Sequence, residues 1–276
     1  MADNAVSSGE SAVYHVVFPP HLGYTGPIFL RRTPLDARQI DLVRKRVTTA
    51  EAVTVLTGAG ISAESGIPTF RGEGGLWKQF KAEELATPEA FRDHPGIVWE
   101  WYHWRRGIIA KKHPNRAHIA LVELEARVPR FTLITQNVDG LHGVAGSRNI
   151  IELHGNLWKM RCPGCDAVIE NRSLETPLLP KCANCLALLR PHVVWFGEAI
   201  DPIDLQKSMK ACRECDVFLV IGTSSLVQPA ASFASLAGAE GAFIAEINIT
   251  PSLPVRPDVY LIGKAAEIVP RLLGSA

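Results

Sequence analysis

A glycine-rich loop directly follows a short apolar segment in the first quarter of the chain. Residues 52–56 have the apolar, β-branched character of a buried strand, and Gly58 and Gly60 come straight after them. A glycine turn after a buried strand lets backbone N–H groups bind the pyrophosphate of a nucleotide. The next glycine is Gly66, so the G-x-G-x-x-G pattern of hydride-transferring enzymes fails at its third position. The loop therefore predicts a dinucleotide site of another kind.

Segments with strand character alternate along the chain with segments of helical periodicity. Ile40, Val43 and Val47 recur at the spacing of one helix face, and residues 79–127 are predicted to be mostly helical. This alternation predicts an α/β fold, a Rossmann-like parallel sheet with helices on both faces. Further strands are expected at residues 131–135, 149–153, 217–221 and 243–247.

The pattern also suggests a domain organisation. Residues 1–37 form an N-terminal arm, rich in Ser, Pro and Gly, to which we assign no purpose. Residues 38–156 and 190–276 are expected to form the Rossmann-type domain, with a helical insertion at about 79–127. Residues 157–189 contain a group of cysteines and are expected to form a small inserted zinc module.

The cysteines of this module have the spacing of a zinc ribbon, C-x2-C-x16-C-x2-C. Each C-x-x-C pair can direct two thiolates at one point, and two pairs complete a tetrahedron. Because four sulfur ligands leave no open position for water, the expected Zn²⁺ is structural rather than catalytic. A ribbon that binds nucleic acid is the alternative, but basic residues are few here and acidic residues are interleaved with them. The expected ligands are Cys162, Cys165, Cys182 and Cys185.

Charge and cysteine usage argue against several classes of partner. The chain has 276 residues, with 29 Lys and Arg against 28 Asp and Glu, so no overall field draws it to nucleic acid or to a membrane. No apolar run approaches the roughly 20 residues of a membrane helix. The N-terminus lacks a basic start followed by an apolar core, which argues against a secretory signal, and Asp3 and Glu10 argue against a mitochondrial transit peptide. We expect a cytoplasmic protein and a monomer. The remaining cysteines, Cys212 and Cys215, are expected to serve packing.

Polar side chains follow two of the expected strands, at the edge where parallel sheets bind ligands. Gln136, Asn137 and Asp139 follow one strand and could hold an amide-bearing ring and a ribose, while His154 follows the next. An imidazole suits general-base chemistry near neutral pH, but His142 lies on the loop that follows the first of these strands and competes for this role. The spacing alone leaves the choice between the two histidines open.

Two later strand ends also carry groups that can bind phosphate or ribose. Gly222, Thr223 and Ser224 close one strand, and Asn248 ends the next, where hydride-transferring enzymes usually have an acid. Each segment is also compatible with an ordinary turn, in which Gly, Ser and Asn are common.

Together these motifs resemble the sirtuins, the NAD-dependent protein deacylases. The resemblance covers roughly residues 38–273, follows the order of motifs in that family and includes the four cysteines. It implies a Rossmann-type domain, a small zinc domain and a cleft between them. The motifs are Gly-Ala-Gly-Ile-Ser-Ala-Glu-Ser-Gly-Ile-Pro-Thr-Phe-Arg from residue 58, Thr-Gln-Asn-Val-Asp-Gly-Leu-His from 135, Leu-His-Gly from 153, Val-Val-Trp-Phe-Gly-Glu from 193 and Gly-Thr-Ser-Ser from 222.

The resemblance also implies roles for single residues. His154 matches the general base of the family, which favours it over His142, and Asn137 and Asp139 match catalytic positions. Residues 193–198 match the strand that pairs with the backbone of an acylated protein, so that Val193, Phe196, Gly197, Glu198 and, opposite them, Val227 are expected to contact substrate. The implied NAD contacts are Gly58, Ala59, Gly60, Ala63, Thr69, Phe70, Arg71, Trp77, Gln136, Asn137, Asp139, Gly222, Thr223, Ser224, Asn248 and Ala265.

Tyr102 and Arg105 narrow the expected substrate. They stand three residues apart in a helical segment and therefore share one face. Similar sirtuins with Tyr-x-x-Arg at this point remove succinyl and malonyl groups as well as acetyl, and a buried guanidinium offers a paired fork to a distal carboxylate. The alternative is a surface arginine beside Trp101 and Trp104, with Arg106 equally able to serve.

The reaction that the resemblance implies consumes NAD and transfers the acyl group from lysine to ADP-ribose. Its products are nicotinamide, O-acyl-ADP-ribose and free lysine, and His154 takes a proton from the ribose diol. Mono-ADP-ribosyl transfer at the same NAD site is the alternative activity. A catalytically silent NAD-binding scaffold is an alternative of another class, and intact His154, Asn137 and Asp139 argue against it.

Overall fold

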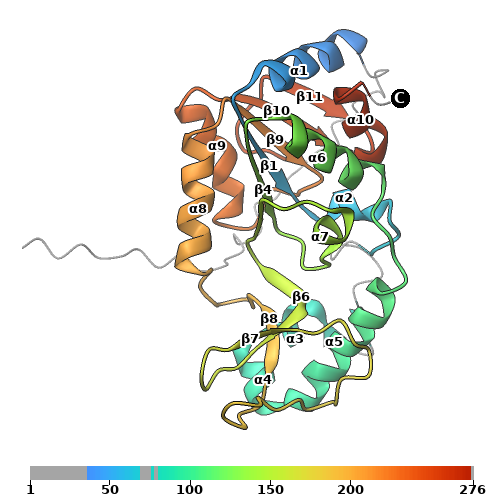
Figure 1. The fold of residues 1–276 in the computed structure, drawn as a ribbon, viewed down its shortest axis with the longest axis vertical. Coiled ribbons are helices and arrows are strands. Elements are labelled where there is room, and N and C mark those ends of the chain that lie inside the picture. The colour runs from blue at the N-terminus through green and yellow to red at the C-terminus, as the bar shows by residue number, and fades with distance from the viewer. Residues whose placement is uncertain (1–35, 69–75, 78–79, 275–276) are drawn as a thin grey trace, which may run out of the picture.

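A computed structural model describes residues 36–68, 76–77 and 80–274; most of the N-terminal arm and the expected NAD contacts Thr69, Phe70 and Arg71 lie outside them. Strands alternate with helices, as predicted (Figure 1). The helices are α1 (Ala37–Thr49), α2 (Ala59–Ala63), α3 (Ala82–Leu85), α4 (Pro88–Asp93), α5 (Pro95–Ile109), α6 (Arg116–Arg127), α7 (Leu141–Ala145), α8 (Pro202–Arg213), the 3-10 helix η1 (Ala230–Ser232), α9 (Phe233–Ala239) and α10 (Ala265–Leu272). The strands are β1 (Ala52–Thr57), β2 (Leu76–Trp77), β3 (Phe80–Lys81), β4 (Arg130–Thr135), β5 (Ile150–Glu152), β6 (Gly155–Arg161), β7 (Val168–Glu170), β8 (Arg190–Val193), β9 (Val217–Ile221), β10 (Phe243–Asn248) and β11 (Val259–Ile262).

Six strands form one parallel sheet in the order β11-β10-β9-β1-β4-β5. The chain builds the sheet outward from β1 in one direction and then, from β9, in the other, which is the order of doubly wound dinucleotide-binding sheets. Thr57 at the end of β1 pairs with Thr135 of β4 and with Ile221 of β9, so the loops after these three strands leave the sheet at one level. The predicted α/β class with a Rossmann-like parallel sheet is confirmed.

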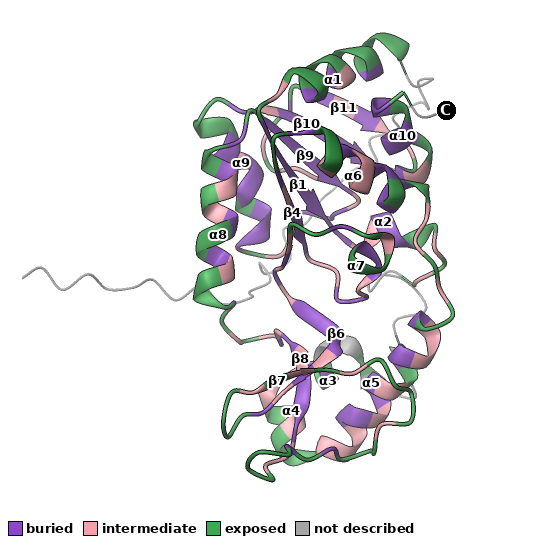
Figure 2. Ribbon diagram, viewed as in Figure 1, coloured by how far each residue is buried: buried purple, intermediate pink, exposed green. Residues whose placement is uncertain are grey.

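Helices cover both faces of this sheet, because successive side chains of each strand point to opposite sides. Val53 and Val55 of β1 pack in one core with α1, α6 and α10, whereas Ala52 and Leu56 pack in another with α8 and α9. Figure 2 shows the strands buried between helices whose outer faces are exposed. A buried sheet of this kind fixes the strand ends rigidly, and the candidate site lies at those ends.

The third cysteine pair is buried between α8 and the sheet. Cys212 is fully buried, Cys215 nearly so, and both belong to the second core. Burial raises the pKa of the Cys215 thiol to about 11, which keeps it protonated and unreactive. The predicted packing role of this pair is confirmed.

A smaller lobe lies on the side where the strands of the sheet end (Figure 1). Its strands are antiparallel in the order β7-β6-β8, with α3, α4 and α5 beside them. A third core joins α5 to this small sheet, and the Trp99 indole N–H donates across it to the Leu189 carbonyl at 3.0 Å. The helical segment expected at residues 79–127 is therefore shared: α5 packs with the cysteine module, whereas α6 packs on the parallel sheet.

The two lobes join at His154 and Gly155, between β5 and β6. Gly155 has a φ of 82°, and a Cβ there would lie 2.1 Å from the His192 carbonyl oxygen, so only glycine allows β6 and β8 to approach this closely. The Val194 N–H donates to the His154 carbonyl at 3.0 Å and ties the segment after β8 to the same point. Within the described part of the chain, no helix combines the length and apolar character needed to cross a membrane.

Candidate active site

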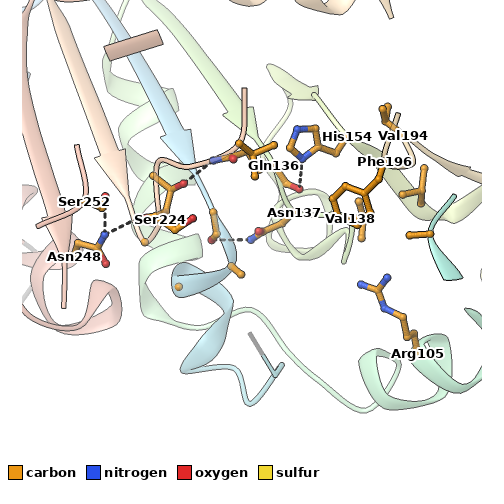
Figure 3. Close-up of a pocket in the computed structure, with 18 of the residues that line it drawn as sticks. Arg105, Gln136, Asn137, Val138, His154, Val194, Phe196, Ser224, Asn248 and Ser252 are labelled. Carbon is orange, nitrogen blue, oxygen red and sulfur yellow. Dashed lines mark hydrogen bonds between the residues drawn. The ribbon is translucent and has the colours of Figure 1, made fainter. Parts of the chain in front are cut away.

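A cavity of about 390 Å³ lies between the ends of the parallel strands and the smaller lobe (Figure 3). Its volume is within the range of pockets that bind cofactors and small ligands. The loops after β1, β4, β9 and β10 line it from the sheet, and α5 and the segment around the end of β8 line it from the lobe. The predicted site residues that line it are Gly58, Ala59, Gly60, Tyr102, Arg105, Gln136, Asn137, His154, Val193, Phe196, Gly222, Thr223, Ser224, Val227 and Asn248.

The glycine loop after β1 lies against the loop after β9, at the point where the strand order reverses. The Gly60 N–H donates to the Gly222 carbonyl at 2.7 Å, and a Cβ on Gly60 would lie 2.7 Å from the Gly222 Cα. A Cβ on Gly58 would lie 2.8 Å from the Thr223 Cα, and Gly222 has a φ of 60°. Glycine at these three positions therefore lets the two loops touch backbone to backbone, at the switch point where doubly wound sheets bind a dinucleotide. The part of the cavity that these glycines line is called the glycine crevice below.

Side-chain hydrogen bonds hold the loops around the crevice (Figure 3). The Gln136 amide donates to the Thr223 hydroxyl at 2.9 Å, and the Asn248 amide donates to the Thr223 carbonyl at 2.7 Å. Glu246, fully buried in β10, accepts hydrogen bonds from the N–H and the hydroxyl of Ser252, both at 2.7 Å. Neither Glu246 nor Ser252 is among the predicted site residues, although an acid inside an apolar strand is a signal that could have identified Glu246.

Asp139 is buried in a polar cluster behind the crevice. Its carboxylate accepts hydrogen bonds from the Ser62 hydroxyl and the Leu141 N–H, both at 2.8 Å. The Asn137 amide donates to the same Ser62 hydroxyl at 3.2 Å. Burial raises the pKa of Asp139, and these hydrogen bonds to its carboxylate oppose the change. Ser62 is a residue of the site that sequence reasoning missed, although it lies within the glycine motif.

His154 faces the cavity with its two ring nitrogens in different surroundings (Figure 3). Nδ1 lies 3.2 Å from the Gln136 carbonyl oxygen, so we assign the proton to Nδ1 and leave Nε2 unprotonated. Nε2 is buried, and no described residue forms a hydrogen bond with it. Burial lowers the pKa of His154 to about 4, so the imidazole is neutral at pH 7.

His142, the competing histidine, is enclosed elsewhere. Its side chain is buried, its Nε2 lies 3.0 Å from the Thr57 hydroxyl, and its ring centroid is 4.8 Å from that of His118. It does not line the cavity. Because a histidine without access to the cavity cannot exchange a proton with a ligand there, the geometry leaves His154 as the candidate base.

Tyr102 and Arg105 line the end of the cavity that belongs to the smaller lobe. Arg105 is only 9% exposed, its guanidinium lies 4.9 Å from the centre of the Trp101 ring, and it points toward the cavity in Figure 3. Burial lowers the pKa of Arg105 to about 10, so it still carries its charge at pH 7. Tyr102 is fully buried, and its hydroxyl accepts a hydrogen bond from the Trp195 indole at 2.8 Å.

Arg106 has a different environment from its neighbour. Its Nε donates to the Leu157 carbonyl at 2.7 Å, and its guanidinium lies 5.8 Å and 5.7 Å from the ring centres of Trp99 and Trp158. Arg106 does not line the cavity. Arg105 is therefore neither a surface arginine nor interchangeable with Arg106.

Several predicted site residues lie away from this cavity. Ala63 ends α2 and is exposed, and Ala265 begins α10 and is buried. Gly197 is exposed with a φ of 83°, while Glu198 makes an ion pair inside the smaller lobe. None of these four lines the cavity. Trp77 lies in β2.

The cysteines of the predicted zinc module converge on one point. Their Sγ atoms all lie within 4.8 Å of one another, with 3.3 Å between Cys162 and Cys185 and 3.6 Å between Cys165 and Cys182. Four sulfurs placed about 2.3 Å from a Zn²⁺ are about 3.8 Å apart, so the cluster has the size of a tetrahedral four-cysteine site. None of the four lines the cavity, as a structural site requires.

The fold and this site define a doubly wound α/β protein with a dinucleotide-type crevice and a four-cysteine module. A family model described as "Sir2 family" matches residues 58–229. The NAD-dependent protein deacylase of Aquifex aeolicus is 56% identical over 200 residues, which cover 71% of this chain and 82% of that protein. NAD-dependent protein deacylase 1 of Caldanaerobacter subterraneus subsp. tengcongensis is 51% identical over 210 residues, which cover 75% of this chain and 86% of that protein.

A solved structure agrees with these relatives. It is described as a Sir2 homologue–NAD complex, is 46% identical, and superposes with a TM-score of 0.80 over 85% of this chain and 92% of that chain. The chain belongs to the Sir2 family, the sirtuins, as its motifs predict.

Proposed function

We propose that this protein is an NAD-dependent protein-lysine deacylase. The observation that carries the proposal is a single cavity that joins a glycine crevice, a neutral histidine and a buried arginine. The two relatives described above are named NAD-dependent protein deacylases, and each aligns with more than two thirds of this chain. These names do not favour mono-ADP-ribosyl transfer.

NAD and Zn²⁺ each fit a site that this chain provides. Gly58, Gly60 and Gly222 line the cavity without side chains and let the loops after β1 and β9 touch, so a pyrophosphate can approach the strand ends there, with Gln136 and Asn248 nearby to contact ribose. When bound, NAD supplies the ribose that accepts the acyl group. The four cysteines would hold one structural Zn²⁺ that fixes the loops of the small sheet.

His154 acts in this proposal as the proton acceptor. The Gln136 carbonyl holds Nδ1–H, which fixes both the tautomer and the ring orientation, and burial keeps the imidazole neutral so that Nε2 can take a proton. Asn137 lines the cavity and can contact a ligand. Asp139 acts through Ser62 and is a positioning residue.

The acyl-lysine would lie between the segment after β8 and the loop after β9. Val193, Phe196 and Val227 line the cavity there, and their apolar side chains suit the methylene stem of a lysine. Main-chain pairing with residues 193–198 would bind many peptide sequences, because it depends little on side chains.

We further infer that succinyl and malonyl groups are accepted as well as acetyl. Arg105 is charged and already buried before any ligand binds, so a distal carboxylate would meet a desolvated partner. Ala86 also lines the cavity, and its small side chain leaves space for the longer acyl chain.

One assay tests the proposal: purified protein with NAD and matched acetyl-, succinyl- and malonyl-lysine peptides, with nicotinamide release as the readout. Release that requires both NAD and an acylated peptide is expected, and no release with any peptide would contradict the deacylase. His154→Asn should lower kcat by about 100-fold or more, with NAD affinity and zinc content unchanged. Full activity in that variant would remove His154 from the role of base.

A further inference from the structure

Tyr102 and Arg105 line one end of the cavity, called the acyl end here. Trp195 connects this end to the segment after β8. The Trp195 indole N–H donates to the Tyr102 hydroxyl at 2.8 Å, and both side chains are buried. We propose that Trp195 is a positioning residue for acidic acyl groups, because it fixes the Tyr102 hydroxyl as a donor toward the ligand. This inference rests on the proposed deacylase function and on its acidic acyl substrates.

The direction of the hydrogen bond carries the argument. An indole N–H can only donate, so the Tyr102 oxygen must act as the acceptor, and the phenolic hydrogen is left for another partner. Within the described residues, the structure gives this hydroxyl no second hydrogen bond, and Tyr102 lines the cavity. Burial raises the pKa of Tyr102, so the hydroxyl keeps its hydrogen at neutral pH.

A ligand next to Tyr102 is therefore favoured when it presents an acceptor. The distal carboxylate of a succinyl or malonyl group can accept from Tyr102 while it pairs with Arg105. An acetyl group has no acceptor that reaches the Tyr102 hydroxyl. A buried hydroxyl without an acceptor is unfavourable unless a water molecule takes the place of the acceptor. Acidic acyl groups are thus favoured by the oriented hydroxyl of Tyr102 as well as by the charge of Arg105.

Two charged side chains hold the indole in place. The Arg190 guanidinium lies 3.4 Å from the centre of the Trp195 ring, and Arg190 makes a two-pronged ion pair with Glu198, at 2.9 Å between Nη2 and Oε2. Glu198 also accepts the backbone N–H of Trp195 at 2.9 Å. Because the ring face and the backbone are both held, the indole N–H has a fixed direction toward Tyr102.

The test compares Trp195→Phe, Tyr102→Phe and the double variant with wild type on succinyl- and acetyl-lysine peptides. Trp195→Phe keeps a ring in the core but removes the donor, so KM for the succinyl peptide should rise roughly tenfold while KM for the acetyl peptide changes less than about twofold. In the Tyr102→Phe background, adding Trp195→Phe should leave the ratio of the two KM values unchanged. If Trp195→Phe does not fold, 3-benzothienylalanine at position 195 keeps the shape of the indole without its N–H, and the same shifts are expected.

The outcomes separate this inference from the function on which it rests. If wild type releases no nicotinamide from the succinyl peptide but does so from the acetyl peptide, the acidic acyl proposal fails, and this inference fails with it. If wild type and Tyr102→Phe show the same succinyl-to-acetyl ratio, this inference alone is overturned. If Tyr102→Phe lowers the ratio but loss of the Trp195 N–H does not, only this inference is overturned. A loss of equal size on both peptides also overturns it, because a purely structural role of Trp195 predicts that result.

Discussion

Replacing Arg105 by methionine separates the recognition of the acyl group from the chemistry of its transfer. Methionine has a comparable length and is apolar, so Arg105→Met keeps the contact with Trp101 while it removes the charge and the fork of N–H donors. The glycine crevice lies on the other lobe and His154, the proposed base, lies at the junction of the two lobes; both are outside the third core. We therefore expect desuccinylation to fall sharply and deacetylation to change little.

The magnitude follows from the burial of Arg105. Burial lowers its pKa from 12.5 to about 10 against opposing effects of Tyr102 and Asp139, which corresponds, at about 1.36 kcal/mol per unit, to a net cost of about 3 kcal/mol for the charged form. Arg105 is 9% exposed in the free protein, so this cost is present before any ligand binds. It therefore does not reduce the free energy that the arginine contributes to binding a carboxylate. Charge-assisted hydrogen bonds contribute about 1.5–3 kcal/mol each, and a net loss of about 3 kcal/mol corresponds to a drop of roughly 100-fold in kcat/KM.

The assay measures nicotinamide release from peptides that differ only in the acyl group. Arg105→Lys is expected to be intermediate, because an ammonium keeps the charge but not the paired fork. Lys111→Met is the matched control: it removes one positive charge from an exposed position just after α5 and should leave both activities unchanged. Loss of equal size on the acetyl and succinyl peptides, or undiminished desuccinylation, would refute the reasoning.

Three further predictions concern the crevice, the buried histidines and the cysteines. Gly60→Ala should weaken NAD binding at least about tenfold by calorimetry, because its Cβ would lie 2.7 Å from the Gly222 Cα; Gly96→Ala, with no atom within 4 Å, should bind NAD normally. Burial lowers the pKa of His118 to about 4, so the unfolded chain binds more protons between pH 4 and 6.5 and stability falls as the pH falls through that range. Urea unfolding at pH 7 and pH 5 should therefore show wild type losing about 2 kcal/mol more than His118→Asn, and equal losses would contradict this. Removal of Zn²⁺ by a chelator should lower the melting temperature and abolish deacylation, and an unchanged melting curve would count against a structural metal.

The parallel sheet is the part of the fold that local sequence signals predict best. Its strands are apolar on both faces, so residues 52–56, 131–135, 217–221 and 243–247 stand out as short apolar runs, and their order follows from strands that alternate with helices. The strand β11 (Val259–Ile262) lies at the edge of the sheet and was not predicted. The four cysteines are found equally well, because metal geometry imposes fixed spacing on the chain.

Contacts between distant segments are what the sequence does not reveal. Spacing could not decide between His142 and His154, because the decision depends on how α7 packs against His118 and how β5 leads into β6. Trp195 and Tyr102 are 93 residues apart, and neither residue type alone indicates the other as its partner. Such pairs are fixed by tertiary packing, on which local propensity has no bearing.

The two ends of the cavity depend on different cores, and this has a consequence for the metal. Gly58 and Gly222 follow strands that are packed within the parallel sheet, whereas Tyr102 lies in the third core together with Cys162 and Cys182. His154 lies at the junction, since it connects β5 of the sheet to β6 of the smaller lobe. Loss of Zn²⁺ should therefore loosen the acyl end and shift it relative to His154, while the crevice keeps its shape. Chelation should consequently give a zinc-free protein that no longer deacylates peptides but still binds NAD. If NAD binding is lost together with deacylation, the two cores do not behave independently.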